Sequence, residues 1–274
     1  MKVTVMMAVY NGEKYIGDCI KSIVRQTFSD FELLVIDDGS TDDTRNIIRS
    51  FDDPRIRLIC NGHDYIASLN IGLQESRGEY IARMDADDVM YPLRLEEQVN
   101  LMDSRKEIDA CGTWARTFGL MTFDIQRGRH LVRNPLAELL LKNMFTHPTM
   151  MLRKSFLDEH GLTYKEYPYA EDYKLWLDIA LCGGKFWVIP QPLLSYRISR
   201  EHVSCVHHKE QDETTLRIQN EALLAILNDE TCSEIGTLQN IYEQLENLNG
   251  KRLLTADMVR QIVYEIYKNL KSGE

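Results

Sequence analysis

The chain has 274 residues, 44% of them hydrophobic, which is enough for a substantial core in one large α/β domain that carries a small appendage. The formal net charge of −10 and the pI near 5.3 argue against a nucleic-acid partner, because binding to a phosphate backbone depends on Lys and Arg. Six scattered cysteines lack the paired spacing of a zinc or redox site, and no apolar run approaches the roughly 20 residues that span a bilayer. We therefore expect a cytoplasmic protein that is soluble or at most peripheral to a membrane.

The first 90 residues alternate between strand-like and helix-like patterns. Apolar runs predict strands at residues 3–9, 31–36, 55–60 and 79–84. Helical spacing and cap signals predict helices at 13–25, from 40 to 51, and through Leu69 and Leu73. Because strands that alternate with helices imply right-handed crossovers, we predict an α/β fold with a mostly parallel sheet.

The pattern is less regular after Pro92. We predict a helix at about 93–101, a strand pair at 108–123, a mobile polar and basic loop at 124–134, a strand at 147–152, a helix at 172–181, and short strands at 186–189 and 193–197. Beyond residue 207 the apolar spacing is helical, notably at 238–248 and 258–270. We therefore divide the chain into an α/β unit of residues 1–206 and a helical carboxy-terminal region of residues 207–274.

Two clusters of aspartates stand directly after predicted strands, at Asp37-Asp38-Gly39-Ser40 and at Asp85-Ala86-Asp87-Asp88. Ligands of open α/β sheets sit outside the carboxyl ends of the strands, and like charges gathered there repel one another unless a cation compensates. Alternate residues of an extended segment point the same way, so Asp85 and Asp87 can share one ligand, and two carboxylates with phosphates and water suit Mg²⁺ or Mn²⁺. The alternatives are a capped strand-to-helix turn for the first cluster and a solvated loop for the second.

Other polar positions have both a structural and a functional interpretation. Glu171 and Asp172 head a predicted helix, where the macrodipole favours acids in any protein. His147, before Pro148, is more often a core or turn histidine than a ligand. Arg197 at a strand end could bind a diphosphate or form a structural ion pair. A basic patch could be a solvated loop or could contact an acceptor that carries phosphate; it comprises Arg127, Arg129, His130 and Arg133.

Ten short segments of the chain form an ordered series. They are Val5-Met6-Met7-Ala8-Val9-Tyr10-Asn11-Gly12, Gln26-Thr27-Phe28, Phe31-Glu32-Leu33-Leu34-Val35-Ile36-Asp37-Asp38-Gly39-Ser40-Thr41-Asp42, Leu69-Asn70, Gly78-Glu79-Tyr80-Ile81, Met84-Asp85-Ala86-Asp87-Asp88, Pro92-Leu93-Arg94-Leu95, His147-Pro148-Thr149, Ala170-Glu171-Asp172-Tyr173 and Tyr196-Arg197-Ile198. Taken in order, these segments resemble the family 2 glycosyltransferases with the GT-A fold. The resemblance covers about residues 2–204; any one motif is weak, but ten in the right order are specific.

The resemblance implies a Rossmann-like nucleotide-binding half with a mixed, mostly parallel sheet, and it implies nucleotide-binding residues. Tyr10 would stack near a uracil, and Asp38 would bind the N–H of the base with Asp37 in support. Ala8 stands where many relatives place a hydroxyl near the base. Asp85 would contact the ribose or a metal.

The resemblance also implies the reacting groups. Asp87 would be the direct ligand of Mn²⁺ or Mg²⁺, and Asp172 matches the general base of the family, with Glu171 beside it. His147 and Arg197 match positions near the diphosphate or the acceptor. Ser199 stands where many relatives have a histidine near the metal, so either His202 substitutes for it or the third protein ligand is absent.

From the resemblance we expect a metal-dependent, inverting glycosyltransferase. It would add one sugar from a nucleotide-sugar, a UDP-sugar by preference, to a saccharide or lipid-linked oligosaccharide at the cytoplasmic face of the membrane, in the assembly of bacterial surface polysaccharide. The carboxy-terminal helices could seal the acceptor side, form an oligomer or rest on a membrane. The rivals are a non-catalytic nucleotide-sugar binding protein and a sugar nucleotidyltransferase. A dinucleotide-dependent oxidoreductase lacks support, because no Gly-x-Gly-x-x-Gly follows the first strand.

Overall fold

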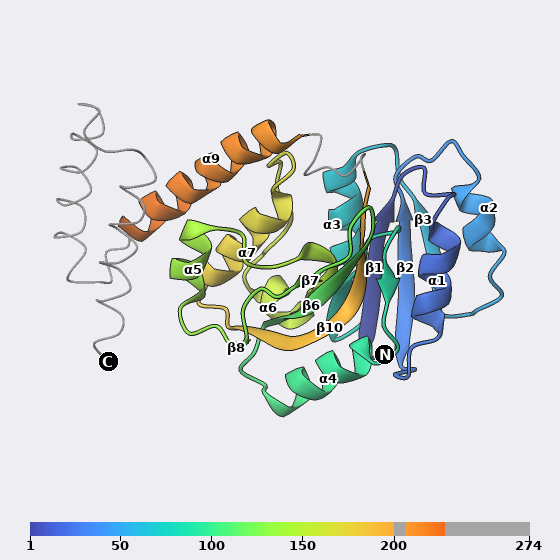
Figure 1. The fold of residues 1–274 in the computed structure, drawn as a ribbon, viewed down its shortest axis with the longest axis horizontal. Coiled ribbons are helices and arrows are strands. Elements are labelled where there is room, and N and C mark those ends of the chain that lie inside the picture. Colours follow the sequence, from blue (N-terminus) through green and yellow to red (C-terminus); the bar gives the residue numbers. More distant parts are fainter. Residues whose placement is uncertain (200–206, 228–274) are drawn as a thin grey trace.

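The computed structural model describes residues 1–199 and 207–227, so the helices predicted at 238–248 and 258–270 lie outside the described residues. A ten-stranded mixed sheet forms the centre of the molecule, with helices on both faces (Figure 1). This confirms the predicted α/β class. None of the helices in the described part combines the length and the apolarity that crossing a membrane would require.

The amino-terminal half has the predicted alternation and places four parallel strands in the order β3-β2-β1-β4. β1 and β2 are buried almost throughout, which explains why both are apolar runs and not alternating patterns. The strands are β1 Val3–Val9, β2 Phe31–Asp37, β3 Ile56–Cys60 and β4 Tyr80–Arg83, and the helices are α1 Ile16–Val24, α2 Thr44–Arg49 and α3 Tyr65–Glu75.

Alternate side chains of β1 enter two separate cores, as the period of two in a strand requires. Val5 and Met7 pack with α1, α2 and α4 (Arg94–Ser104) on one face, whereas Met6 packs with α3 on the other. The second core also contains residues of α5 (Pro135–Leu141), α6 (Lys154–Glu159) and α7 (Glu171–Leu181). The domain is therefore a three-layer sandwich.

The second half of the sheet is mixed. β9 (Met151–Arg153) joins β4 to β6 (Ala110–Gly119) by antiparallel pairing, and β6 runs parallel to β10 (Phe186–Ile198). Short antiparallel strands complete the sheet: β5 Val89–Met90, β7 Asp124–Ile125 and β8 His130–Leu131.

Several predicted elements of this half were wrong in detail. The expected strand pair at 108–123 is one strand whose antiparallel partner begins at Asp124, and the loop expected at 124–134 contains β7 and β8. Residues 147–149 form a 3₁₀ turn with Pro148 near its start, ahead of β9. The two short strands expected at 186–197 are one strand, β10, with register shifts on either side of Pro192, which lacks an N–H for the ladder.

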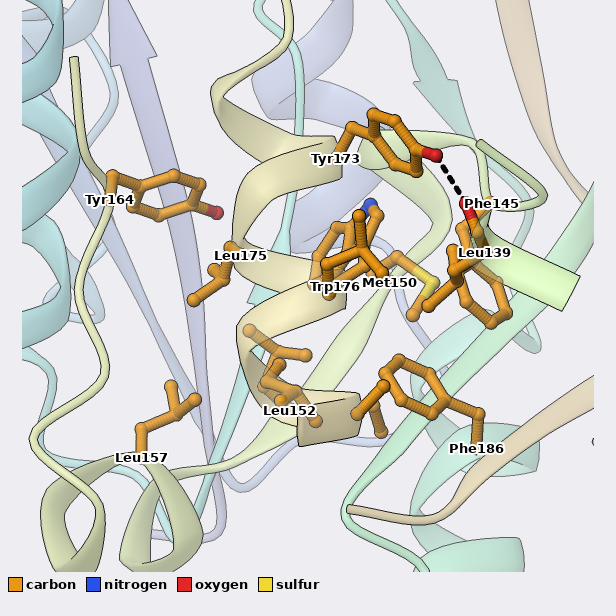
Figure 2. Packing of buried hydrophobic residues seen from close by; sticks show 14 of the residues in the cluster. Leu139, Phe145, Met150, Leu152, Leu157, Tyr164, Tyr173, Leu175, Trp176 and Phe186 are labelled. Atoms are coloured by element: carbon orange, nitrogen blue, oxygen red, sulfur yellow. Dashed lines mark hydrogen bonds between the residues drawn. The ribbon is translucent and has the colours of Figure 1, made fainter. Parts of the chain in front are cut away.

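Helix α7 is fixed by an aromatic cluster at the centre of the second core (Figure 2). Phe145 stacks on Phe186 with ring centroids 4.8 Å apart and meets Trp176 edge-on at 6.2 Å. Tyr173 donates its hydroxyl hydrogen to the Leu139 carbonyl of α5. Each large aromatic buries about 150–250 Å², so this cluster holds the amino-terminal end of α7 firmly against the sheet.

Helix α9 (His208–Leu227) begins the predicted helical carboxy-terminal region and lies against α7 and α5 (Figure 1). Ile218, Ala222 and Leu223 belong to the same core as α7. Gln219 donates from Nε2 to the Leu141 carbonyl at 3.1 Å. The first helix of this region therefore shares its hydrophobic packing with the sheet domain.

Candidate active site

The two aspartates at the carboxyl end of β2 are buried and hold different loops. Asp38 accepts hydrogen bonds at Oδ1 from the Asp64 N–H and the Ser68 hydroxyl, both at 2.7 Å, which fixes the start of α3. Asp37 accepts at Oδ2 from Arg45 Nε at 2.5 Å, while its Oδ1 has no hydrogen-bond partner among the described residues. Neither carboxylate caps α2, but Asp37 Oδ2 also accepts from the Ser40 N–H at 3.2 Å, so the structural interpretation as a stabilised strand-to-helix turn holds in part for Asp37.

Beside this pair, directly after β1, the aromatic side chain of Tyr10 is partly exposed. The half-exposed Tyr10 ring lies 4.2 Å from the His63 ring, and His63 Nδ1 lies 3.6 Å from Asp38 Oδ2. Ala8 is half-buried and pairs in register with Ile36. Tyr10 and Asp38 thus both neighbour His63, a residue for which the sequence held no signal.

The second aspartate cluster follows the carboxyl end of β4. Hydrogen bonds from Arg197 connect this cluster to β10. The Arg197 N–H donates to Asp88 Oδ1 at 2.7 Å, and Arg197 Nε donates to the Asp87 carbonyl at 2.9 Å. The guanidinium of Arg197 also lies over the Tyr15 ring at 3.9 Å. Arg197 therefore lies next to Asp87, and Asp88, which sequence reasoning did not single out, positions this loop.

Asp88 is fully buried, and one of its oxygens, Oδ2, has no hydrogen-bond partner among the described residues. Burial raises the pKa of Asp88 well above its usual range, and the negative charges of Asp85 and Asp87 raise it further. Three carboxylates thus repel one another in one short loop, which favours a cation beside them.

Arg83, at the end of β4, is a buried cation that the sequence analysis missed. Its side chain is only 2% exposed and pairs with Asp85, and its Nη2 donates to the Tyr65 hydroxyl at 2.9 Å. Its Nε, also buried, has no hydrogen-bond partner among the described residues. A buried guanidinium with incomplete hydrogen bonding is energetically unfavourable, which suggests a functional reason for its presence.

A cavity of about 1080 Å³ opens between β4, α7, α9 and the turn before β9. Arg83, Asp85, His147, Glu171 and Asp172 all line it. Tyr10, Asp38 and Asp87 do not line it, although Tyr65 at the start of α3 does, one residue after the Asp64 N–H that Asp38 binds. The cavity therefore joins Asp85 to the predicted base, and α3 connects it to the β1–β2 edge.

Asp172 is half-buried at the amino-terminal end of α7 and is held at both oxygens. Asn143 donates from Nδ2 to its Oδ2 at 3.1 Å, and the Tyr173 N–H donates to its Oδ1 at 2.6 Å. Burial raises the pKa of Asp172, whereas the hydrogen bond from Asn143 lowers it. An oriented carboxylate that faces a cavity can accept a proton from a bound hydroxyl, so the geometry suits a general base.

Two other residues that line the cavity, Glu171 and His147, also have shifted pKa values. Burial raises the pKa of Glu171 to about 7, and the charge of Asp172 adds to the rise. Burial lowers the pKa of His147 well below its usual range, with a further contribution from Arg83. His147 Nε2 lies 2.8 Å from the Tyr164 hydroxyl, so it is a neutral hydrogen-bonding group of the cavity wall at pH 7.

We expect the Glu171→Gln substitution to stabilise the protein at pH 8 by about 2 kcal/mol and to have little effect at pH 5. The folded protein binds the Glu171 proton more tightly than the unfolded chain does. The unfolding free energy of the protein with glutamate at this position therefore falls as the pH rises from about 4.5 to about 7. Glutamine has no proton to lose. Denaturant titrations of both proteins at the two pH values measure the difference, and an equal gain at both would contradict the assignment.

The donor set around Asp85 fits a metal only in part. No three metal-ligating side chains converge within residues 1–199 and 207–227, and His202 lies outside the described residues. Asp85 and Asp87 together offer two carboxylates, and a Mg²⁺ or Mn²⁺ site commonly consists of one or two carboxylates, substrate phosphates and water. The repulsion at Asp88 shows that a cation beside this loop would be stabilised, so the residues fit a metal that arrives with a phosphate ligand.

Known proteins resemble the chain in sequence and in fold. The glycosyl transferase family 2 model matches residues 4–161. An uncharacterized glycosyltransferase of Haemophilus influenzae is 34% identical over 98% of the chain and 86% of its own length. The O-antigen biosynthesis glycosyltransferase WbnJ of Escherichia coli is 34% identical over 72% of the chain and 79% of its own length. The crystal structure of S. aureus TarS 1-349 in complex with UDP-GlcNAc superposes with a TM-score of 0.73 at 21% identity, covering 90% of the chain and 72% of TarS.

Proposed function

The chain belongs to glycosyl transferase family 2 and has the GT-A fold, and we propose that it transfers one sugar, with inversion, from a UDP-sugar to a saccharide or lipid-linked oligosaccharide. The observation that carries the proposal is that Asp85 and Asp172 line the same cavity. The carboxylate proposed to bind the donor and the proposed base therefore face one binding space. The UDP-GlcNAc complex of TarS supports the donor, and the O-antigen role named for WbnJ supports a surface-polysaccharide acceptor such as capsule or lipopolysaccharide.

The donor lies, in this proposal, across the carboxyl ends of β1, β2 and β4. Tyr10 stacks on the base, and Asp38 accepts its N–H at Oδ2, the oxygen that the Asp64 and Ser68 hydrogen bonds do not use and that lies 3.6 Å from His63 Nδ1. Asp37 stays paired with Arg45 and supports the strand end. Asp85 and Asp87 would hold a Mg²⁺ or Mn²⁺, which supplies positive charge to the departing diphosphate.

The reaction itself needs a base and a fixed geometry. Asp172 takes the proton of the acceptor hydroxyl as that oxygen attacks the sugar on the face opposite the diphosphate. The bond from the anomeric carbon to the phosphate oxygen breaks as the new glycosidic bond forms, so the configuration inverts and no enzyme nucleophile is required. Asn143 and the Tyr173 N–H hold the Asp172 carboxylate in place, which is the orientation that such a displacement depends on.

A nucleotide-release assay over a panel of sugar donors, with and without Mn²⁺, tests the proposal. Glycosyl transfer releases a nucleoside diphosphate, whereas nucleotidyl transfer releases diphosphate and a non-catalytic binding protein releases neither. Release of UDP that requires both a UDP-sugar and an acceptor is the expected result. Release of diphosphate, or binding without any turnover, would favour one of the two rivals.

We expect Asp87→Ala to weaken metal-dependent donor binding by at least about tenfold, because one of the two proposed carboxylate ligands is lost. Donor affinity is measured by calorimetry with UDP in the presence and absence of Mn²⁺. Asp158→Ala is the control, because Asp158 is an exposed acid of α6 paired with Lys154. Equal Mn²⁺ dependence in the native and Asp87→Ala proteins would remove Asp87 from the metal site.

A further inference from the structure

The carboxylate of Asp38, to which we assign the N–H of the base, is covered in the structure. Its side chain is only 4% exposed, although it stands directly after β2 at the edge of the sheet. Hydrogen bonds from Asp64 and Ser68 use Oδ1, so Oδ2 is the oxygen that a base has to reach. A planar base cannot approach an oxygen that is so deeply covered. Access to Oδ2 therefore requires that a covering group moves.

The imidazole of His63 covers this oxygen and is itself exposed. The His63 side chain is 65% exposed, and its Nδ1 lies 3.6 Å from Asp38 Oδ2 and 3.2 Å from the Asp38 carbonyl oxygen. Its ring lies against the Tyr10 ring, with centroids 4.2 Å apart and planes tilted by 34°. A bound uracil needs the same two features, an aromatic face at Tyr10 and a ring nitrogen close to Oδ2. The imidazole therefore lies at the position that the two contacts of the base define.

The backbone that carries His63 is tied to the end of β2 on both sides. The Asn61 N–H donates to the last carbonyl of β2 at 2.8 Å, and the Asp64 N–H donates to Asp38 Oδ1 at 2.7 Å. His63 has a φ of 44°, in the left-handed region that histidine enters more readily than most residues. Gly39 makes the approach possible, because a Cβ there would lie 3.1 Å from the His63 nitrogen. The loop thus directs the ring onto the Asp38 carboxylate.

The ring itself is held weakly. Among the described residues it has no hydrogen bond, ion pair or ring contact other than those with Asp38 and Tyr10. Rotation of the side chain carries the ring into solvent without breaking the backbone hydrogen bonds of the loop, and exposed side chains change rotamer within nanoseconds. Displacement costs one ring contact and one hydrogen-bonding contact. A base that stacks on Tyr10 and binds Oδ2 replaces both.

We infer that the imidazole of His63 occupies the base site of the donor-free protein and that the base displaces it into solvent when the donor binds. The inference rests on the proposed function, because it takes Tyr10 and Asp38 to bind the base. A side chain that fills the site weakens the binding of every nucleotide there by the same factor, which the fraction of open sites sets. His63 therefore lowers the affinity for the product UDP as well and helps to clear the site after transfer.

Calorimetric titration of the full chain with UDP, UMP and inorganic diphosphate, in the presence of Mn²⁺, tests the inference. His63→Gly removes the ring and suits the left-handed backbone. We expect this variant to bind UDP and UMP about fivefold or more tightly than the native chain does, by one factor for both, and to bind diphosphate with native affinity. His63→Asn, which also tolerates a positive φ, should show a similar gain without the added flexibility of glycine.

His160→Asn is the matched control, because His160 makes the same two kinds of contact outside the cavity. Its Nδ1 lies 2.9 Å from the Phe156 carbonyl oxygen, and its ring lies 4.3 Å from the Phe156 ring. This substitution should leave the affinity for UDP unchanged.

Three results would overturn the inference and leave UDP as the donor. Unchanged affinity in both His63 variants would place the base away from the covered oxygen, weaker binding would make the ring a fixed wall of the site, and a gain that extends to diphosphate would assign the effect to the loop. Absence of UDP binding to the native chain and to every variant would instead overturn the proposed donor, and the inference with it.

Discussion

Asp172→Asn is expected to lower the turnover number by about 10²–10⁴-fold, the usual contribution of a positioned general base, while donor affinity stays within about twofold. Asparagine keeps the size of the side chain and can still accept the Tyr173 N–H, so the start of α7 should not move. The ability to take a proton is lost, together with the hydrogen bond from Asn143, because an amide NH2 group cannot accept it. Steady-state release of UDP and calorimetric binding of UDP measure the two quantities separately.

Asp178→Asn is the matched control for this experiment. Asp178 lies on the same helix and is nearly buried, but it pairs with Lys165 and Lys174 and does not line the cavity. Its substitution should lower the unfolding free energy and leave the turnover number unchanged. Transfer by Asp172→Asn at the native rate would show that another group is the base, and a joint loss of turnover and of donor binding would point to a disturbed fold.

Much of the amino-terminal half could be predicted because its information is local. β1 and β2 are buried on both faces and therefore appear as uninterrupted apolar runs, and each is followed by a helix with its own apolar face. The elements of the second half of the sheet were harder to predict from the sequence. The strand predicted at 147–152 begins only at Met151, because residues 147–149 form a 3₁₀ turn, and the pairing of β9 with β4 and β6 has no local signal. α5 did have a signal that was overlooked, since Asn134 caps it and Pro135 opens it.

The candidate site, like the fold, has one part that could be predicted from the sequence and one part that could not. The position of acids after β2 and β4 follows from the sheet and was therefore predictable, whereas the sequence did not indicate that Asp85 lines the cavity and Asp87 does not. The partners of these acids were not predictable. Arg197 reaches Asp88 across 109 positions, and Asn143 reaches Asp172 across 29. Such contacts depend on how the second half of the sheet and its loops pack, which periodicity does not report.

The second large effect is expected at Arg83. The Arg83→Met substitution should lower kcat/KM at pH 7 by at least about 100-fold while changing the unfolding free energy by less than about 1.5 kcal/mol. Burial raises the pKa of Asp172, and the positive charge of Arg83 opposes that rise. Without Arg83 the pKa of Asp172 rises further. The acid limb of the pH profile should move to higher pH.

The small effect on stability follows from the poor environment of the guanidinium. Arg83 is fully buried, yet its Nε has no hydrogen-bond partner among the described residues, so its desolvation is only partly offset. Its anionic partner, Asp85, is 31% exposed and can be hydrated after the substitution. Removing one partner of a buried ion pair is costly chiefly when the other charge stays buried, and the exposed part of Asp85 lets water replace the guanidinium. Function, not stability, would then explain why an arginine occupies the floor of the cavity.

The Arg94→Met substitution distinguishes an effect on the pH profile from an effect on stability, because Arg94 is as deeply buried as Arg83 but does not line the cavity. It donates from Nε to Gln98 Oε1 at 3.1 Å and from Nη2 to the Arg83 carbonyl at 2.9 Å. Its loss leaves these acceptors unsatisfied, at about 1–3 kcal/mol of unfolding free energy, and should leave the acid limb where it is. If Arg83→Met behaved like Arg94→Met, with lower stability and an unshifted pH profile, Arg83 would be a structural residue and the cavity would need another source of positive charge to keep its base ionised.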